Sequence, residues 1–135
     1  MSEFIDYVRS LPKAELHLHI EGTLEPAMLM TLAEKHQVDL PYSTAADVEG
    51  AYEFGDLQSF LDLYYLGASV LIDAGDFYSL MFRYLERCRD EGIVHTEMMF
   101  DPQTHTERGI GFPVFMSGFG QAMGDARRQW GQSSS

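Results

Sequence analysis

The sequence stretch LPKAELHLHIEGT, residues Leu11 to Thr23, decides the fold because it predicts a β-strand that ends in a turn. Residues 14–20 alternate with the two-residue period of a strand. One face carries the apolar side chains that an inner strand packs against its surroundings: Leu16, Leu18 and Ile20. Gly22 and Thr23 then end the strand and permit a turn. We therefore expect a strand with one buried face at residues 14–20.

The opposite face of this strand carries two imidazoles, because His17 and His19 are two residues apart. Their Cα atoms would lie about 6.5–7 Å apart, near enough for both rings to reach one metal ion at about 2.1 Å. The pair also lies near the carboxyl end of the strand, where α/β barrels carry their chemistry. Histidines also occur in folded proteins as neutral, hydrogen-bonded side chains without a metal. The tripeptide alone therefore leaves both interpretations open.

The residues around the pair, PKAELHLHIEGTLEP at 12–26, resemble the opening of the adenosine and adenine deaminases. This is a family of metal-dependent purine aminohydrolases built on a TIM-type barrel. The resemblance implies that His17 and His19 bind a catalytic zinc ion, Zn2+. It also implies an α/β fold class, namely the N-terminal portion of a TIM-type (β/α)8 barrel with extra helices after the first strand.

The length of the chain conflicts with a complete barrel, which needs about 250 residues, because the chain has 135. One independent domain of this size could bury a core, so length alone excludes nothing else. The resemblance, however, covers nearly the whole chain and corresponds to the first two strand–helix units of the family. We therefore expect residues 1–135 to be the incomplete N-terminal part of a single deaminase barrel domain in a longer enzyme.

The composition limits the classes of partner that the chain can bind. It contains nine Lys and Arg and 21 Asp and Glu, for a formal net charge of −12. No basic field is available for nucleic acid or an anionic membrane surface, so we expect neither as a partner. The longest uncharged runs, residues 63–72 and 109–124, are too short or too rich in glycine to span a membrane. Cys88 is the single cysteine, which excludes a disulfide framework and fits a cytoplasmic protein.

The same cysteine count excludes another class of zinc deaminase. The small cytidine-deaminase type needs an H-x-E motif and a P-C-x-x-C pair. The P-C-x-x-C pair is absent from this sequence, because it has a single cysteine.

Apolar periodicity predicts the remaining elements: helices at about 2–10, 25–37, 47–54, 57–71 and 77–91, and a second strand at 93–100. Asp56 and Asp76 are the expected N-caps of the fourth and fifth helices, and Gly92 is expected to close the fifth. His36 is expected at the edge of its helix as an ordinary side chain. The segment from Phe112 to Trp130 should form a further helix.

Three glycines interrupt that last helix, at positions 118, 120 and 124. They cost a helix interior about 3 kcal/mol relative to alanine, so tertiary packing must offset the cost or the segment is loose. Their spacing matches neither the P-loop nor the dinucleotide pattern, so a phosphate-binding loop is disfavoured.

The helix after Asp56 carries a broad apolar stripe that includes Phe60 and Tyr64. Core packing is the ordinary interpretation of such a stripe. In the resembled family, a helix in this region lies over the barrel mouth and supplies aromatic side chains around the purine. The resemblance therefore implies that Phe60 and Tyr64 contact the substrate.

The second strand places His95 and Glu97 on one face, a spacing that also suits metal ligands. The resemblance places no ligand on this strand, so we favour a polar network there. The adjoining residues Phe100-Asp101-Pro102-Gln103 resemble the adenine deaminase branch more than the adenosine branch. The family's catalytic residues lie on later strands, so none is expected within this chain.

The resemblance implies hydrolytic deamination of adenine to hypoxanthine and ammonia, a purine-salvage reaction, by a full-length parent. Glu21 matches an acidic position that contacts the sugar hydroxyl in adenosine deaminases, where it is usually Asp, so the longer side chain favours the free base. Glu21 can equally be an ordinary turn residue. The alternatives are an adenosine deaminase, or a noncatalytic truncated fragment or binding module. The chain alone is expected to be inactive and to self-associate through its open sheet edges.

Overall fold

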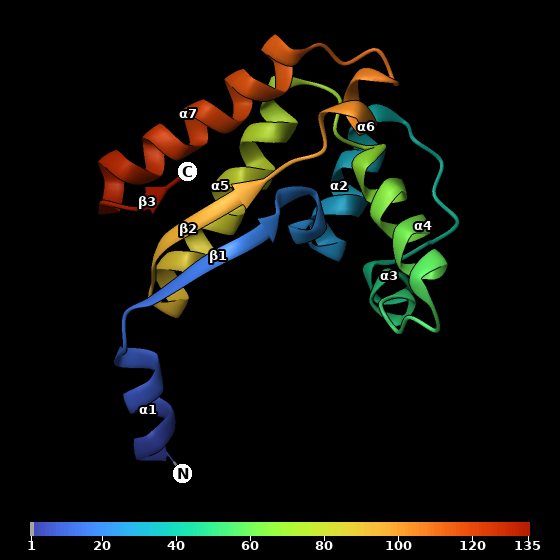
Figure 1. Ribbon diagram of the computed structural model, residues 1–135. Coiled ribbons are helices and arrows are strands. Elements are labelled where there is room, and N and C mark those ends of the chain that lie inside the picture. Colours follow the sequence, from blue (N-terminus) through green and yellow to red (C-terminus); the bar gives the residue numbers. More distant parts are fainter. Residues whose placement is uncertain (1) are drawn as a thin grey trace.

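The chain forms a three-stranded parallel sheet with helices around it, as the computed structural model of residues 2–135 shows (Figure 1). The strands are β1 (Lys13–His19), β2 (Ile93–Met99) and β3 (Ser133–Ser134), in the order β1-β2-β3. The helices are α1 (Ser2–Ser10), the short 3-10 helix η1 (Ile20–Thr23), α2 (Pro26–His36), α3 (Ala45–Ala51), α4 (Leu57–Ala68), α5 (Ala74–Glu91), α6 (Pro102–Thr106) and α7 (Phe112–Trp130).

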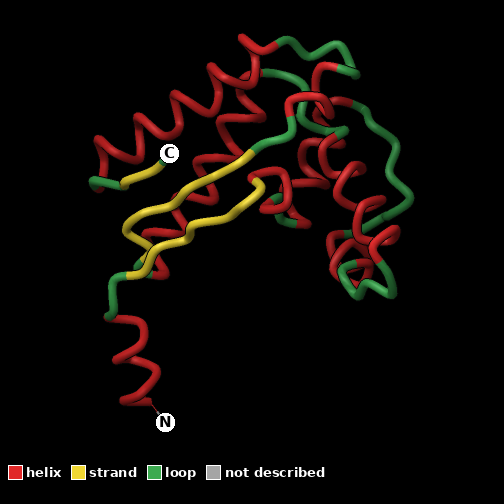
Figure 2. Tube along the Cα trace, viewed as in Figure 1, coloured by secondary structure: helices red, strands yellow, loops and turns green. Residues whose placement is uncertain are grey.

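The arrangement is that of the opening of an α/β barrel, which confirms the predicted fold class. Consecutive strands are parallel, and α5 and α7 run back beside the sheet as its crossovers (Figure 2). Helices α2, α3, α4 and α6 gather near the carboxyl ends of β1 and β2 (Figure 1). The extra helices after the first strand therefore lie at the end of the sheet where such folds place their sites.

The sheet contains a third strand that the sequence did not predict, since two strand–helix units were expected. The segment after Gly131 is polar and lacks strand periodicity. Backbone hydrogen bonds place it, because Ser135 N donates to Thr96 O at 3.0 Å and Met98 N donates to Ser135 O at 2.7 Å. A strand placed mainly by backbone pairing leaves no apolar side-chain pattern to detect.

The pairing of β1 with β2 shifts register within β1, and this corrects one prediction. Glu15 pairs with Thr96 and Leu18 with Met98, so β1 advances three residues while β2 advances two. Leu16 therefore leaves the buried face and is 59% exposed. Leu18 packs against the core and Ile20 is buried, as predicted.

Helix N-termini follow the predicted cap chemistry with two corrections. Asp56 caps α4 as predicted, with Ser59 completing a capping box. The N-cap of α5 is Asp73, not Asp76. The Asp73 side chain accepts a hydrogen bond from Asp76 N, and the Asp76 side chain accepts one from Asp73 N. Likewise, Thr44 caps α3 and the predicted starter Asp47 is its reciprocal partner. A capping box has polar residues three apart, and periodicity alone does not say which comes first.

The glycine-rich segment forms an unbroken helix, α7, and Gly118 explains how. A Cβ at Gly118 would lie 2.8 Å from Phe77 Cβ and 2.8 Å from Tyr78 N, and closer still to the Ala74 carbonyl. The glycine thus lets α7 approach the backbone of α5. Packing of Phe115 and Phe119 against α5 offsets the low helix propensity, because both rings are buried next to Phe77.

The core lies between the sheet and α5 and α7 and extends to α2 and α4. Its largest fully buried apolar side chains are Phe77, Phe115, Ile20, Leu29, Leu71, Leu80 and Leu85. Cys88 is also buried, and burial raises the pKa of its thiol, so it packs as an apolar side chain.

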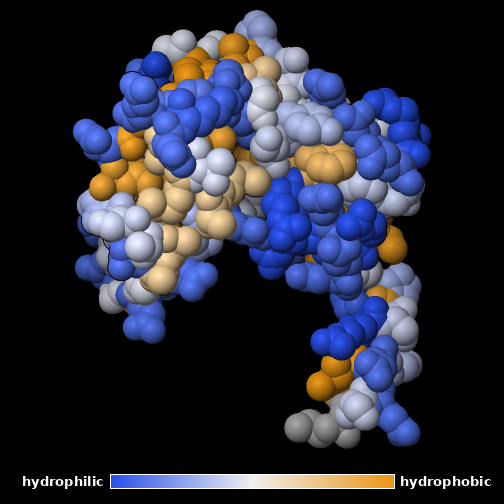
Figure 3. All heavy atoms as spheres, turned by 180° about the vertical axis from the view of Figure 1, so that it is seen from behind, coloured by the Kyte–Doolittle hydropathy of each residue, from blue (hydrophilic) through white to orange (hydrophobic). Residues whose placement is uncertain are grey.

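Helix α1 contributes nothing to this core, because none of its residues is buried. It projects away from the rest of the chain with hydrophobic atoms on its surface (Figure 3). Phe4 is 70% exposed and Tyr7 is 60% exposed. Among residues 2–135, no helix combines the length and the hydrophobicity that crossing a membrane requires.

We predict that Gly118→Ala destabilises the chain by about 1–3 kcal/mol, because the added methyl overpacks the contact between α5 and α7. Gly120→Ala is the matched control in the same helix, since a Cβ there meets nothing within 4 Å. The control should stabilise by about 0.5–1 kcal/mol. Urea unfolding of both variants measures the difference, and equal stabilities would contradict the close-approach account.

Candidate functional site

His17 and His19 lie together on one side of β1, at its carboxyl end. Their ring centroids are 5.6 Å apart and both side chains are exposed. Among residues 2–135, neither ring has a hydrogen bond to another group. The structure thus brings the two predicted ligands together with ring nitrogens free to bind. A tetrahedral zinc site needs about two further ligands, so the pair fits half of such a site.

A cleft of about 630 Å³ opens beside this pair. It is lined by His17, Leu18, His19, Gly22, Phe60, Leu61, Tyr64, Tyr65, Phe100 and Asp101. Its volume falls within the range of small-molecule sites, about 300–1,000 Å³. The cleft therefore joins the histidine pair of β1, the aromatic residues of α4 and the residue pair that follows β2.

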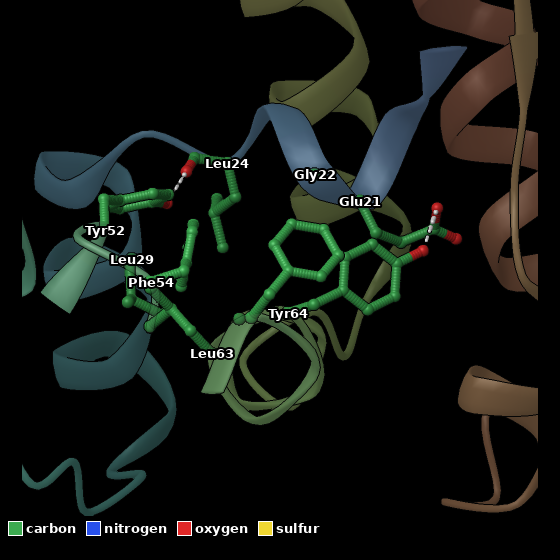
Figure 4. Close-up of a pocket in the computed structure, with 10 residues that line it drawn as sticks. Glu21, Gly22, Leu24, Leu29, Tyr52, Phe54, Leu63 and Tyr64 are labelled. Carbon is green, nitrogen blue, oxygen red and sulfur yellow. Dashed lines mark hydrogen bonds between the residues drawn. The ribbon is translucent and has the colours of Figure 1, made fainter. Parts of the chain in front are cut away.

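Helix α4 supplies the aromatic wall of the cleft. Phe60 and Tyr64 are one helical turn apart, so their side chains share a face and their ring centroids lie 6.2 Å apart. Both also line a small adjoining cavity of about 30 Å³, shown in Figure 4. The structure thus brings the two predicted substrate contacts together beside the histidine pair.

The carboxylate of Glu21 lies inside the protein, with a side-chain exposure of 0%. Its Oε1 accepts hydrogen bonds from Asp101 N at 2.7 Å and from His105 Nε2 at 2.9 Å. Its Oε2 accepts from the Tyr64 hydroxyl at 3.1 Å, as Figure 4 shows. Glu21 lines the small cavity and is not among the residues that line the wider cleft. A direct contact between Glu21 and a substrate stays a prediction.

His105 is a buried residue that the sequence reasoning missed. Its ring stacks edge-on against Phe77, with centroids 4.9 Å apart, and its Nδ1 lies 3.3 Å from Arg108 Nη2. A guanidinium only donates hydrogen bonds. Nδ1 therefore accepts from Arg108, and Nε2 carries the proton donated to Glu21. The only sequence signal was the i, i+3 spacing of His105, in α6, and Arg108, in the turn that follows it, and α6 is too short to show periodicity.

The electrostatics around Glu21 keep Tyr64 protonated. Burial raises the pKa of Tyr64 well above its ordinary value, and the adjacent Glu21 charge raises it further. Tyr64 is therefore a hydrogen-bond donor to Glu21 at any physiological pH. Burial lowers the pKa of Arg108, but a guanidinium remains charged in proteins.

His95 and Glu97 of β2 form a separate polar group. His95 Nε2 lies 3.3 Å from Glu97 Oε1, and His95 Nδ1 lies 2.8 Å from the Ser133 hydroxyl of β3. The contact with Ser133 links β2 to β3, and the contact with Glu97 lies within β2, as in a polar network on this face of the sheet.

A second cluster with ligand-type side chains joins the end of α2 to the start of α5. His36 Nε2 lies 2.6 Å from Asp76 Oδ2, and Asp73 lies close by. The Lys35 ammonium, however, lies 2.8 Å from Asp73 and 2.7 Å from Asp76. Lysine therefore already supplies the positive charge that a metal would bring, and the cluster ties two helices together.

A family model described as adenosine deaminase matches residues 12–134, so the chain belongs to the adenosine deaminase family. An adenine deaminase from Hahella chejuensis is 53% identical over 129 residues, which is 96% of this chain and 39% of that protein. The crystal structure of an adenine deaminase from Arthrobacter aurescens superposes with a TM-score of 0.86 at 45% identity, over 91% of this chain and 38% of that one.

A more distant likeness extends the fold comparison. An amidohydrolase from Burkhoderia ambifaria, crystallised with bound zinc, has a TM-score of 0.86 at 20% identity and covers 99% of this chain and 37% of its own. The chain thus spans about two fifths of the length of the proteins it matches.

We predict that Asp76→Asn destabilises the chain near neutral pH by about 1–3 kcal/mol, because a buried carboxylate loses charge-assisted bonds. Burial opposes ionisation of Asp76, but bonds from Lys35, two backbone amides and His36 outweigh it and hold its pKa below the ordinary value. A lowered folded pKa means that this stabilisation exists above the ordinary carboxyl pKa and disappears as the pH falls below about 4.

Urea unfolding between pH 3 and pH 7 measures this effect. The exposed Glu34→Gln of α2 is the control and should leave the pH profile unchanged. A profile for Asp76→Asn as steep as that of the unmodified chain would contradict the assignment.

Proposed function

We propose that residues 1–135 form the N-terminal part of one barrel domain of an adenine deaminase. The full-length protein would hydrolyse adenine to hypoxanthine and ammonia, as a cytoplasmic purine-salvage enzyme. The observation that carries this proposal is the cleft that joins the histidine pair of β1 to the aromatic wall of α4. The high identity to proteins named adenine deaminase supports the same substrate.

His17 and His19 would hold the zinc ion, with the remaining ligands supplied by later strands of the full-length protein. Their free ring nitrogens and shared direction fit such a role. A bound zinc ion lowers the pKa of a water molecule and thereby supplies a nucleophile at neutral pH. Two ligands make an incomplete site, so the isolated chain should bind metal weakly and be inactive.

Phe60 and Tyr64 would bind the purine base through their rings. The Tyr64 hydroxyl donates a hydrogen bond to Glu21, so the Tyr64 ring would supply the contact with the base. A planar, apolar wall suits a heteroaromatic base and excludes water from it. Glu21, which accepts the hydrogen bond of the Tyr64 hydroxyl, would contribute to the choice of adenine over adenosine.

We predict that replacing both His17 and His19 by Ala abolishes zinc binding and activity in the full-length protein, because two ligands of a four-ligand site disappear. His95→Ala is the matched control, since His95 is also a partly exposed histidine on the same sheet. Elemental analysis should find zinc in the control and none in the double variant. Unchanged zinc content in the double variant would overturn the assignment.

We predict that the full-length protein has a higher kcat/KM for adenine than for adenosine. The ratio of these two values defines the discrimination between the substrates. Steady-state assays with both substrates measure it. If no full-length protein is at hand, a chimera in which this chain replaces the matching region of the Hahella chejuensis protein provides a complete barrel. A ratio that favours adenosine would overturn the choice of adenine as the substrate. Absence of activity toward both adenine and adenosine would overturn the assignment as a deaminase.

A further inference from the structure

The end of β1 is connected to two other walls of the cleft through one side chain. Glu21 follows β1, Tyr64 belongs to α4, and Asp101 follows β2. Both Tyr64 and Asp101 line the wider cleft, and both donate hydrogen bonds to the Glu21 carboxylate. We call Glu21 with its three donors, Tyr64, Asp101 N and His105, the Glu21 clamp.

The His105 donor of the Glu21 clamp is placed by contacts away from the cleft. The Glu21 and His105 side chains are both 0% exposed. Arg108 donates to His105 Nδ1 and also binds the carbonyls of Ser69 and Leu71, which follow α4. The hydrogen-bond chain therefore runs from the loop after α4 through α6 to the end of β1.

The chemistry of this arrangement gives Glu21 a role different from a substrate contact. All three hydrogen bonds to its carboxylate come from the protein, and no part of the side chain faces solvent. An oxygen that is already satisfied and buried gains little from a ligand hydroxyl. Removing it would instead free both Tyr64 and the segment at Asp101 to move.

We propose that Glu21 is a positioning residue that fixes Tyr64 and Asp101 beside His17 and His19, and so sets the width of the cleft for a planar purine base. This inference rests on the proposed function for its substrate. The geometry of the clamp does not depend on that function. A purine held against the Tyr64 ring needs the ring at a fixed distance from the metal ligands, and the clamp provides that distance.

Three variants of the full-length, zinc-loaded enzyme test the clamp. We call the hydrogen bond from Tyr64 to Glu21 the arm to α4, and the hydrogen bond from Asp101 N to Glu21 the arm to β2. Glu21→Ala removes both arms and should raise KM for adenine about 10-fold, with kcat changed less than about 3-fold and zinc content unchanged. Tyr64→Phe removes only the arm to α4 and should raise KM by a smaller factor. Glu21→Gln keeps an acceptor for Asp101 N and a donor for the Tyr64 oxygen, so it should retain most of the wild-type KM.

Amide hydrogen exchange at Asp101 provides a readout that does not depend on activity. Exchange should accelerate in Glu21→Ala, where the acceptor is missing, and stay slow in Glu21→Gln and Tyr64→Phe. Asp76→Asn is the matched control, because Asp76 is an equally buried carboxylate in the cluster between α2 and α5. It should lower stability without changing KM or the exchange of Asp101.

Three results would overturn the proposal. One is an unchanged KM and unchanged Asp101 exchange in Glu21→Ala. Another is a Glu21→Gln variant as impaired as Glu21→Ala, since the charge itself would then be used by the substrate. The third is loss of zinc together with loss of kcat in Glu21→Ala. Absence of activity toward adenine in the unmodified full-length enzyme would contradict the proposed function. The exchange rate of the Asp101 amide would still show whether the clamp forms.

Discussion

The site depends on the hydrogen bonds that the buried carboxylate of Glu21 accepts. An unpaired charge inside a protein costs several kcal/mol, so a side chain in this position must be surrounded by donors. Tyr64, Asp101 N and His105 meet that demand, and each comes from a different element. The requirement to satisfy one charge therefore ties α4, α6 and the end of β2 to the end of β1, next to the histidine pair.

The sheet accounts for the two ligands that the proposed zinc site would draw from this chain. A histidine pair at the end of one strand presents two ligands on one side, and an α/β barrel brings further ligands from strands that close around it. The chain contains three parallel strands and spans about two fifths of its relatives' length. Under the proposed function, later parts of the full-length protein would cover the exposed apolar side chains of α1 and the outer edges of the sheet.

Sequence reasoning succeeded where a local pattern determines the structure. The two-residue period placed His17 and His19 on one face, and the helical period brought Phe60 and Tyr64 together. It failed where the cause lies in another element. Leu16 is exposed because of the register with β2, and Gly118 is tolerated because α5 lies against it. His105 belongs to a five-residue helix, and its role depends on Glu21, which is distant in sequence.

The most direct test of this account is the protonation of the His105 ring, measured by long-range proton–nitrogen correlation in the nitrogen-labelled protein at neutral pH. Arg108 donates to Nδ1, so the account predicts a neutral ring with its proton on Nε2, bonded to Glu21. A proton on Nδ1, alone or on both nitrogens, would contradict it, because Arg108 could not then donate a hydrogen bond to that nitrogen.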